Sequence, residues 1–315
     1  MSTASANWPG RLHEVGFYHS DLEFRALIVP FAEAGIAAGQ PVIIGYDERK
    51  ATLLRSWLSD PAAVTFISDN SLYATPAKAI ASYWKMFEQH TAAGATQIRI
   101  AGDVPHEGNG GRFTGWDCYE SAANTVWDRF PVWARCLYDT TTAAAHVLDS
   151  AARTHPRTIT PAGHTHPNHT YQHPEHFQPL PANPDPLERT APALELTDPS
   201  PAQIRRAITS IGHGHIPAPQ LQDLEIAASE AVSNAWQHGH PPITAQIRAR
   251  ANRILVHVHD TGPGPANPHV GLTPAWANHE YRQSGLWLVH MLNLDTALIR
   301  SPDGFTIRLA AGQAA

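Results

Sequence analysis

The sequence has 315 residues, of which 43% are hydrophobic and 16% are charged. At roughly 150 residues per domain, this length predicts about two domains, each with enough apolar material for its own core. The 22 Lys and Arg residues against 28 Asp and Glu residues give a net charge of −6, which argues against direct binding of nucleic acid.

We expect a cytoplasmic protein with no membrane partner. The longest apolar stretches, such as 26–31 and 254–258, fall far short of the roughly 20 residues of a membrane-spanning helix. The first residues, MSTASANWPG, lack the basic and apolar regions of a signal peptide. Cys118 and Cys136 are the only cysteines, too few for a disulfide framework or a four-thiolate metal site.

The first 160 residues alternate short apolar runs with longer helical patterns, which predicts crossover units around a mainly parallel sheet. The strand candidates are 14–18, 41–46, 64–67, 97–100 and 134–138. Helices are expected between them, for example at 21–38, 77–93 and 116–129, and a last one at 143–152 ends before His155-Pro156. Residues 1–160 are therefore predicted to form an α/β domain.

Residues 161–190 hold seven of the 27 prolines and five of the 20 histidines. Because proline removes backbone donors and stiffens the chain, we expect an extended linker between two folded units. Its histidines are His164, His166, His169, His173 and His176. Imidazole binds Zn²⁺ and Ni²⁺ well, so a metal sensor built on this linker is one alternative function. A flexible linker rarely preorganises a site, which favours adventitious metal binding.

After the linker, the order of elements changes to that of an α+β sandwich over residues 191–315. We expect a strand at 194–196, helices at 201–211 and 221–237, two alternating strands, a long loop, a helix and a final strand. In the second alternating strand, Ile254, Val256 and Val258 share one face, and Asp260 continues that parity. An acid therefore ends an apolar face.

Three separated segments of this second domain fit one ligand. Glu230 and Asn234 are four residues apart, so both project from one face of a helix. Asp260 begins the segment DTGPG, whose glycines let the backbone approach a ligand closely and whose carboxylate can accept from an adenine amino group. The segment SGLWLV can open a helix whose first backbone amides face a phosphate. Taken singly, each piece is usually a solvated helix face or a turn.

In this order, the three segments resemble the N, G1 and G2 boxes of the GHKL ATPase superfamily (HATPase_c). EAVSNAWQHG, DTGPGP and GLWLVHML are most similar to the anti-sigma-factor serine kinases. The resemblance implies ATP and Mg²⁺ as cofactors, with Glu230 as the catalytic residue that orients or deprotonates the acceptor hydroxyl and Asn234 as the Mg²⁺ ligand. It assigns adenine recognition to Asp260, the adenine pocket to Gly262 and Gly264, and the phosphate-facing helix to Ser284, Gly285 and Leu286.

The third box departs from the family pattern, because the chain reads RQSGL where the family commonly shows GRGL. The lid candidate, 266–283, contains only Arg282 as a strong cation for the phosphates. Nucleotide binding without phosphoryl transfer therefore stays an alternative. His238 matches the family's usual histidine after the N box, or else ends a helix at Gly239.

The first domain resembles the MEDS sensory domain, a degenerate RecA-type sheet, over residues 11–160. The resemblance rests on HEVGFYHSDLEF, VTFISD, RIAG, and CLYD leading to RTHP. The segment YHSDLEF lacks the glycine and lysine of a phosphate loop, so nucleotide chemistry is not expected here. Cys136, Tyr138 and Asp139 lie at a predicted strand end, where α/β ligands bind, or are a buried thiol and a capping acid. Four aromatic residues line a pocket or fill the core: Trp116, Tyr119, Trp127 and Trp133.

Together the resemblances imply a signal-responsive anti-sigma regulator. Its partners would be a sigma factor and a STAS-type anti-anti-sigma protein, whose serine would be phosphorylated, and a homodimer is also implied. The chain between the linker and Glu230 has no room for the phosphorylatable hairpin of a two-component histidine kinase. A nucleotide-binding anti-sigma module without kinase activity remains the nearest alternative.

Overall fold

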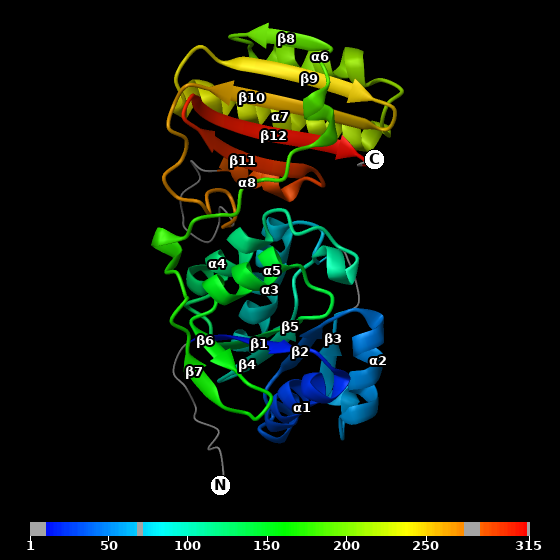
Figure 1. Cartoon of the computed structure of the whole chain (residues 1–315), viewed down its shortest axis with the longest axis vertical. Coiled ribbons are helices and arrows are strands. Elements are labelled where there is room, and N and C mark those ends of the chain that lie inside the picture. The colour runs from blue at the N-terminus through cyan, green and yellow to red at the C-terminus, as the bar shows by residue number, and fades with distance from the viewer. Residues whose placement is uncertain (1–10, 68–71, 274–283, 314–315) are drawn as a thin grey trace. The chain divides into compact units, whose positions relative to one another are not determined.

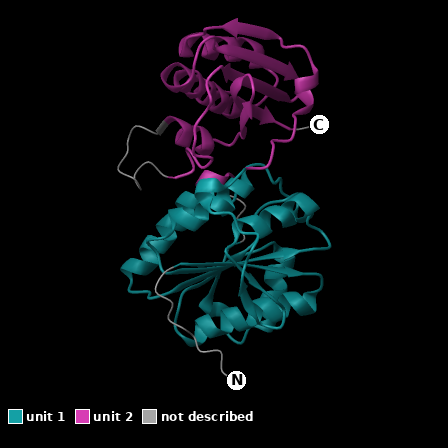
Figure 2. Ribbon diagram, turned by 60° about the vertical axis from the view of Figure 1, so that its left-hand side comes forward, with its two compact units in different colours: residues 1–73, 79–178 teal, residues 74–78, 179–315 magenta. Residues whose placement is uncertain are grey.

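The computed structural model describes residues 11–67, 72–273 and 284–313. The chain divides into two compact units, residues 1–73 with 79–178, and residues 74–78 with 179–315 (Figure 2). Among the described residues, no helix combines the length and the apolar character needed to cross a membrane.

The first unit is built on a seven-stranded sheet with the order β3-β2-β4-β5-β1-β6-β7 (Figure 1). The strands are β1 (Leu12–Tyr18), β2 (Val42–Gly45), β3 (Val64–Phe66), β4 (Ile98–Gly102), β5 (Val132–Asp139), β6 (Arg157–Ile159) and β7 (Thr165–Pro167). Every neighbouring pair is parallel except β6 and β7. The expected α/β fold with a mainly parallel sheet is confirmed.

Helices cover both faces of this sheet. They are α1 (Asp21–Ala37), α2 (Glu48–Trp57), α3 (Pro76–Ala92), α4 (Trp116–Val126) and α5 (Ala145–Thr154). Figure 1 shows α1 and α2 on one side of the strands and α3, α4 and α5 on the other. The first two helices begin with N-cap side chains. Ser20 and Asp47 each accept a hydrogen bond from the backbone N–H three residues later. The α2 helix was not among the helices named from the sequence.

The Pro- and His-rich segment is divided between the two units. Residues up to 178 lie in the first unit and form β7 and a 3₁₀ turn, Pro174–His176. Residues from 179 lie in the second unit and include the 3₁₀ turn Pro186–Arg189. The segment is therefore divided after residue 178, and its buried residues are Pro174, Phe177, Asp185 and Leu187.

The second unit has a five-stranded sheet with the order β11-β12-β10-β9-β8, and all neighbours are antiparallel. Its strands are β8 (Leu194–Thr197), β9 (Thr244–Arg250), β10 (Arg253–Asp260), β11 (Asp295–Ser301) and β12 (Gly304–Gly312), and its helices are α6 (Pro201–Gly212), α7 (Ala218–His238) and α8 (Ser284–Met291). The predicted α+β sandwich is confirmed. The single final strand was wrong, because a turn at Pro302-Asp303 folds the end of the chain into the β11–β12 hairpin.

Strand β10 separates the core of the second unit from its outer face. Ile254, Val256 and Val258 are almost completely buried in the cluster that includes residues of α6 and α7, and Asp260 follows them at 4% exposed. The alternate positions, Arg253, Leu255 and His257, lie on the other face of the strand. The expected parity of β10 therefore brings the Asp260 carboxylate to the helix side of the sheet.

The outer face is covered by the segment 183–190. Leu187 packs with Leu255 and Ala310, which gives this face a small apolar cluster of its own. The Arg253 Nε donates to Asp185 Oδ2 at 2.8 Å, and Arg308 Nη1 donates to Glu188 Oε1 at 2.9 Å. These contacts fix the segment to the sheet through both apolar and charged groups.

Candidate nucleotide site and buried N-terminal cluster

The start of α8 lies against two side chains of α7. A Cβ atom on Gly285 would lie 2.8 Å from Glu230 Oε2 and 3.4 Å from Asn234 Oδ1. The structure therefore brings together Glu230, Asn234 and Gly285 from two of the three predicted segments. The missing side chain of Gly285 leaves space for the Glu230 carboxylate in its present position beside the first turn of the helix.

The Asn234 amide is suited to hold a ligand. Its Nδ2 atom is buried and has no hydrogen-bond partner among the described residues. Buried polar groups are nearly always satisfied in folded proteins, so this amide nitrogen is suited to a ligand that accepts hydrogen bonds. Backbone amides at the start of α8 are also unpaired within the helix and can face an anion.

The Asp260 carboxylate is held by the backbone that surrounds it. Its Oδ1 atom accepts from the N–H of Gly262 at 2.8 Å and of His240 at 3.2 Å. Both bonds go to one oxygen, so the other oxygen can accept from a ligand. A Cβ on Gly239 would lie 2.4 Å from the carboxylate carbon, and a Cβ on Gly262 would lie 2.7 Å from Oδ1.

The end of α7 shows why residue 239 is a glycine and where His238 lies. The helix ends at His238, and the N–H of Gly239 donates to Ala235 O at 2.9 Å. Gly239 has φ of −89°, so it is not a left-handed helix cap. The close Asp260 carboxylate, rather than backbone conformation, requires glycine there. His238 is exposed at the helix end.

The other residues predicted for the site differ in what the structure shows of them. Gly264 has φ of +68°, and a Cβ on it would lie 2.5 Å from the Phe305 ring. Both the backbone conformation and the lack of space therefore require glycine. Leu286 packs against the core cluster of the unit. Ser284 begins α8, and Arg282 lies outside the described residues. Gly239 was predicted only as a possible end of the N-box helix, and its close approach to Asp260 was not predicted.

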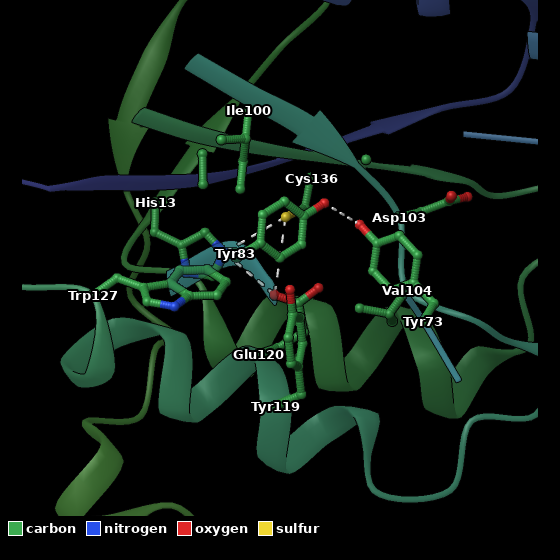
Figure 3. A pocket seen from close by; sticks show the side chains of 12 residues that line it. His13, Tyr73, Tyr83, Ile100, Asp103, Val104, Tyr119, Glu120, Trp127 and Cys136 are labelled. Atoms are coloured by element: carbon green, nitrogen blue, oxygen red, sulfur yellow. Dashed lines mark hydrogen bonds and ion pairs between the residues drawn. The ribbon is translucent and has the colours of Figure 1, made fainter. Parts of the chain in front are cut away.

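The first unit contains a cavity of about 20 Å³ on the α4 side of its sheet (Figure 3). Two of the four aromatic residues named from the sequence, Tyr119 and Trp127, line it together with Cys136. Trp133 instead donates from Nε1 to Glu14 Oε1 at 2.7 Å. The cavity is large enough for about one water molecule.

The three residues at the end of β5 have separate roles. The Tyr138 hydroxyl donates to Glu120 Oε1 at 2.9 Å, and Cys136 lies 3.9 Å from the other oxygen of the same carboxylate. Asp139 Oδ1 accepts from the N–H of Thr141 at 2.9 Å, so this acid caps the following turn. Cys136 and Tyr138 therefore belong to a buried polar cluster, and Asp139 does not.

Burial sets the protonation states in that cluster. It lowers the pKa of His155 to about 3, and burial with the nearby charge of Arg11 lowers the pKa of His13 to about 3. Burial also raises the pKa of Glu120 and of Cys136. Both imidazoles are therefore neutral near pH 7, and each can offer a ring nitrogen as an acceptor.

Comparison with known families agrees with both resemblances. Residues 12–156 match the model of the MEthanogen/methylotroph, DcmR Sensory domain (MEDS), and residues 195–311 match that of the histidine kinase-like ATPase domain. Among curated proteins, none matches this sequence. The first match lies on the parallel sheet and its helices, and the second lies on the sandwich that carries Glu230, Asn234 and Asp260. The chain therefore joins a MEDS sensory domain to an ATP-binding regulatory domain of the GHKL, histidine kinase-like type.

Proposed function

We propose that the second unit binds ATP with Mg²⁺ and phosphorylates a serine of a STAS-type anti-anti-sigma protein, and that it also holds a sigma factor. The first unit would supply the signal that biases this switch. The proposal rests on one observation above all: a carboxylate, an amide nitrogen with no partner among the described residues, and the start of a helix converge at Glu230, Asn234 and Gly285.

Asp260 is proposed to select the adenine base. The two backbone N–H groups that hold Oδ1 fix the carboxylate, and Gly239 and Gly262 leave room beside it. A carboxylate in this position can accept from the exocyclic amino group of adenine, which guanine lacks at the equivalent position. Specificity for ATP over GTP follows from that single acceptor.

Asn234 and the first turn of α8 are proposed to position the phosphates. The amide oxygen is a suitable ligand for Mg²⁺, and the unpaired backbone N–H groups of the helix start suit phosphate oxygens. The metal, when bound, neutralises charge on the transferring phosphate. The Asn234 amide and Gly285 backbone would hold these groups within reach of Glu230.

Glu230 is proposed to accept the proton of the serine hydroxyl as its oxygen attacks the terminal phosphate. General-base assistance of this kind contributes about 10²- to 10⁴-fold to a rate. The carboxylate is partly exposed, so a partner's side chain can reach it.

The test combines the full-length protein with labelled ATP, Mg²⁺ and a STAS-domain protein. We expect label on the partner's serine, loss of transfer in Glu230→Gln with ATP binding retained, and loss of ATP binding in Asp260→Asn. Glu225→Gln is the matched control, because that carboxylate lies on the same helix but bonds to Thr209. The control should transfer phosphate like the wild type.

Two results would overturn parts of the proposal. ATP binding without transfer to any STAS partner would leave a nucleotide-binding anti-sigma module, the nearest alternative. Failure of calorimetry to detect Mg²⁺-dependent ATP binding would remove the nucleotide function altogether. Size-exclusion chromatography with a sigma factor, at high and low ATP, tests the anti-sigma role and the proposed homodimer.

A further inference from the structure

The first unit gathers four potential metal ligands around one point, three of them buried and the fourth, Cys136, partly buried. They come from three elements and one helix end: His13 on β1, Glu120 on α4, Cys136 on β5 and His155 directly after α5. One ligand atom from each residue lies within 4.8 Å of all the others. Figure 3 shows His13, Glu120 and Cys136 pointing toward one another at the cavity.

The spacing of these atoms fits a tetrahedral site. His13 Nε2 lies 3.3 Å from Glu120 Oε2 and 3.5 Å from Cys136 Sγ. Glu120 Oε2 lies 3.5 Å from His155 Nε2 and 3.9 Å from Cys136 Sγ. Zinc bonds of about 2.0–2.3 Å in a tetrahedron place ligand atoms roughly 3.3–3.7 Å apart. The two remaining separations, from His155 to His13 and to Cys136, lie within 4.8 Å, so a single ion can reach all four atoms if the side chains move closer together.

A hydrogen bond at Nδ1 of each imidazole orients its Nε2 toward that point. The Asn124 amide nitrogen donates to Glu120 O at 3.0 Å and Thr154 O at 2.7 Å, so its oxygen is the acceptor for His13 Nδ1 at 3.1 Å. His155 Nδ1 donates to Ala151 O at 2.7 Å. With Nδ1 protonated in both rings, each Nε2 lone pair faces the cluster. Metal-binding histidines are oriented in this way.

His155 Nε2 is the strongest single indication that the cluster binds a cation. The residue is 0% exposed, and within the part of the chain that the structure describes this nitrogen has no hydrogen-bond partner. It faces the Glu120 carboxylate, yet two acceptors without a shared proton or cation repel each other. A cation between them satisfies both.

Charge balance agrees with a divalent ion. One thiolate, one carboxylate and two neutral imidazoles carry two negative charges, so a bound dication leaves the site neutral. A neutral site is the form that can be buried at low cost. The thiol proton leaves to solvent as the Cys136 sulfur binds the metal. A thiolate with two imidazoles selects Zn²⁺ over Mg²⁺ or Ca²⁺, which prefer oxygen ligands.

We propose that His13, Glu120, Cys136 and His155 form a Zn²⁺ site inside the first unit. It does not depend on the nucleotide function proposed for the second unit. It also differs from a site on the histidines of residues 164–176, which the same experiment separates from it.

Cobalt(II) is the spectroscopic probe, because it occupies zinc sites and absorbs strongly when a thiolate binds it. Full-length protein is stripped of metal with a chelator and titrated with Co²⁺, then with Zn²⁺. We expect one equivalent of Co²⁺ with a sulfur-to-cobalt charge-transfer band and tetrahedral d–d bands, both removed by Zn²⁺. Cys136→Ser should lose the charge-transfer band, and the matched control Cys118→Ser should keep it.

Two further variants keep the test decisive if Cys136→Ser fails to fold. Tyr138→Phe removes only the hydroxyl that holds Glu120 Oε1, and should weaken Zn²⁺ binding about 10-fold while leaving ATP binding unchanged. Replacement of all five linker histidines by Gln should leave the cobalt spectrum intact. In the wild type, bound Zn²⁺ should protect Cys136 from a thiol reagent in mass spectrometry.

The proposal is overturned by any of three results. These are a titration without a sulfur-to-cobalt band, a band that survives in Cys136→Ser, or binding that disappears with the linker histidines. The last result would move the metal function to the linker.

Discussion

Asp185 and Asp260 are both buried carboxylates of the second unit, at 5% and 4% exposed, but they lie on opposite faces of the sheet. Asp185 forms an ion pair with the Arg253 guanidinium on the outer face. Asp260 is held by two backbone N–H groups on the inner face and is surrounded by glycines. Burial alone therefore does not identify a functional acid. An acid neutralised by arginine stabilises the fold, and one held by neutral amides keeps an oxygen for a ligand.

The stability of the Asp185→Ala variant should distinguish these two roles most strongly. Asp185→Ala should lower the free energy of unfolding of the second unit by about 3 kcal/mol, because it leaves Arg253 buried with one carboxylate fewer. The value lies at the low end of the range for broken buried pairs because Asp295 Oδ2 still accepts from Arg253 at 2.9 Å. Urea unfolding followed by hydrogen exchange of β10 measures it. Affinity for ATP should be unchanged under folding conditions.

The control for this change is Asp303→Ala, at an exposed turn position of the same unit. It should alter the free energy of unfolding by less than about 0.5 kcal/mol. Equal destabilisation by both variants would mean that the Arg253 pair does not anchor the outer face.

A substitution at Gly285 should affect chemistry more than stability. The Cβ of Gly285→Ala would displace the Glu230 carboxylate, whose oxygen lies 2.8 Å away at the end of a flexible side chain. We expect transfer to the STAS partner to fall about 100-fold, or about 2.7 kcal/mol, with the melting temperature unchanged or raised because alanine favours helix. Single-turnover kinetics at saturating ATP measure the change. Unaltered transfer would show that Glu230 does not act from its present position.

A substitution at Gly239 should weaken nucleotide binding to a smaller extent. Gly239→Ala is compatible with the backbone at φ of −89°, but its Cβ would displace the Asp260 carboxylate. The expected loss of ATP affinity is about 10-fold, or about 1.4 kcal/mol. Calorimetry with His240→Ala provides the comparison, because that variant keeps the backbone N–H that bonds to Asp260. Equal affinities for both variants would argue against adenine recognition by Asp260.

The weakest effect should be a pH dependence of stability that arises from Asp185. Burial raises the pKa of Asp185, but hydrogen bonds from Arg253 and Leu187 outweigh it and hold that pKa below the usual value. The stabilisation is therefore fully present above the unfolded pKa of about 3.9 and is lost as pH falls through the lower folded pKa. The difference in unfolding free energy between wild type and Asp185→Asn should be constant above about pH 5 and shrink below pH 4. A constant difference throughout would exclude this assignment.

The nucleotide site was open to prediction because its pieces are local in sequence. Helical spacing placed Glu230 and Asn234 on one face, and strand parity placed Asp260 at the end of an apolar face. The cluster in the first unit was not predicted, since His13, Glu120 and His155 approach one another only after β1, α4 and α5 pack together. The segments HEVG, CLYD and RTHP each contain one of its members, yet nothing local connects them.

The final hairpin shows a different kind of failure. The sequence pattern predicted one final strand, whereas the turn at Pro302-Asp303, followed by Gly304, divides this stretch into β11 and β12. That signal was present in the sequence. The role of Gly239 was not, because its neighbour Asp260 is twenty-one residues away and becomes close only in the sheet.

The segment 183–190 has a practical consequence for anyone who isolates the ATPase unit. A fragment cut to the family-matched residues 195–311 would lack Asp185, Leu187 and Glu188. It would expose Leu255 and Ala310 to water, and Arg308 would lose Glu188 while Arg253 would keep only Asp295 of its two carboxylate partners. Such a fragment should aggregate on expression, whereas one starting at residue 179 should stay monodisperse.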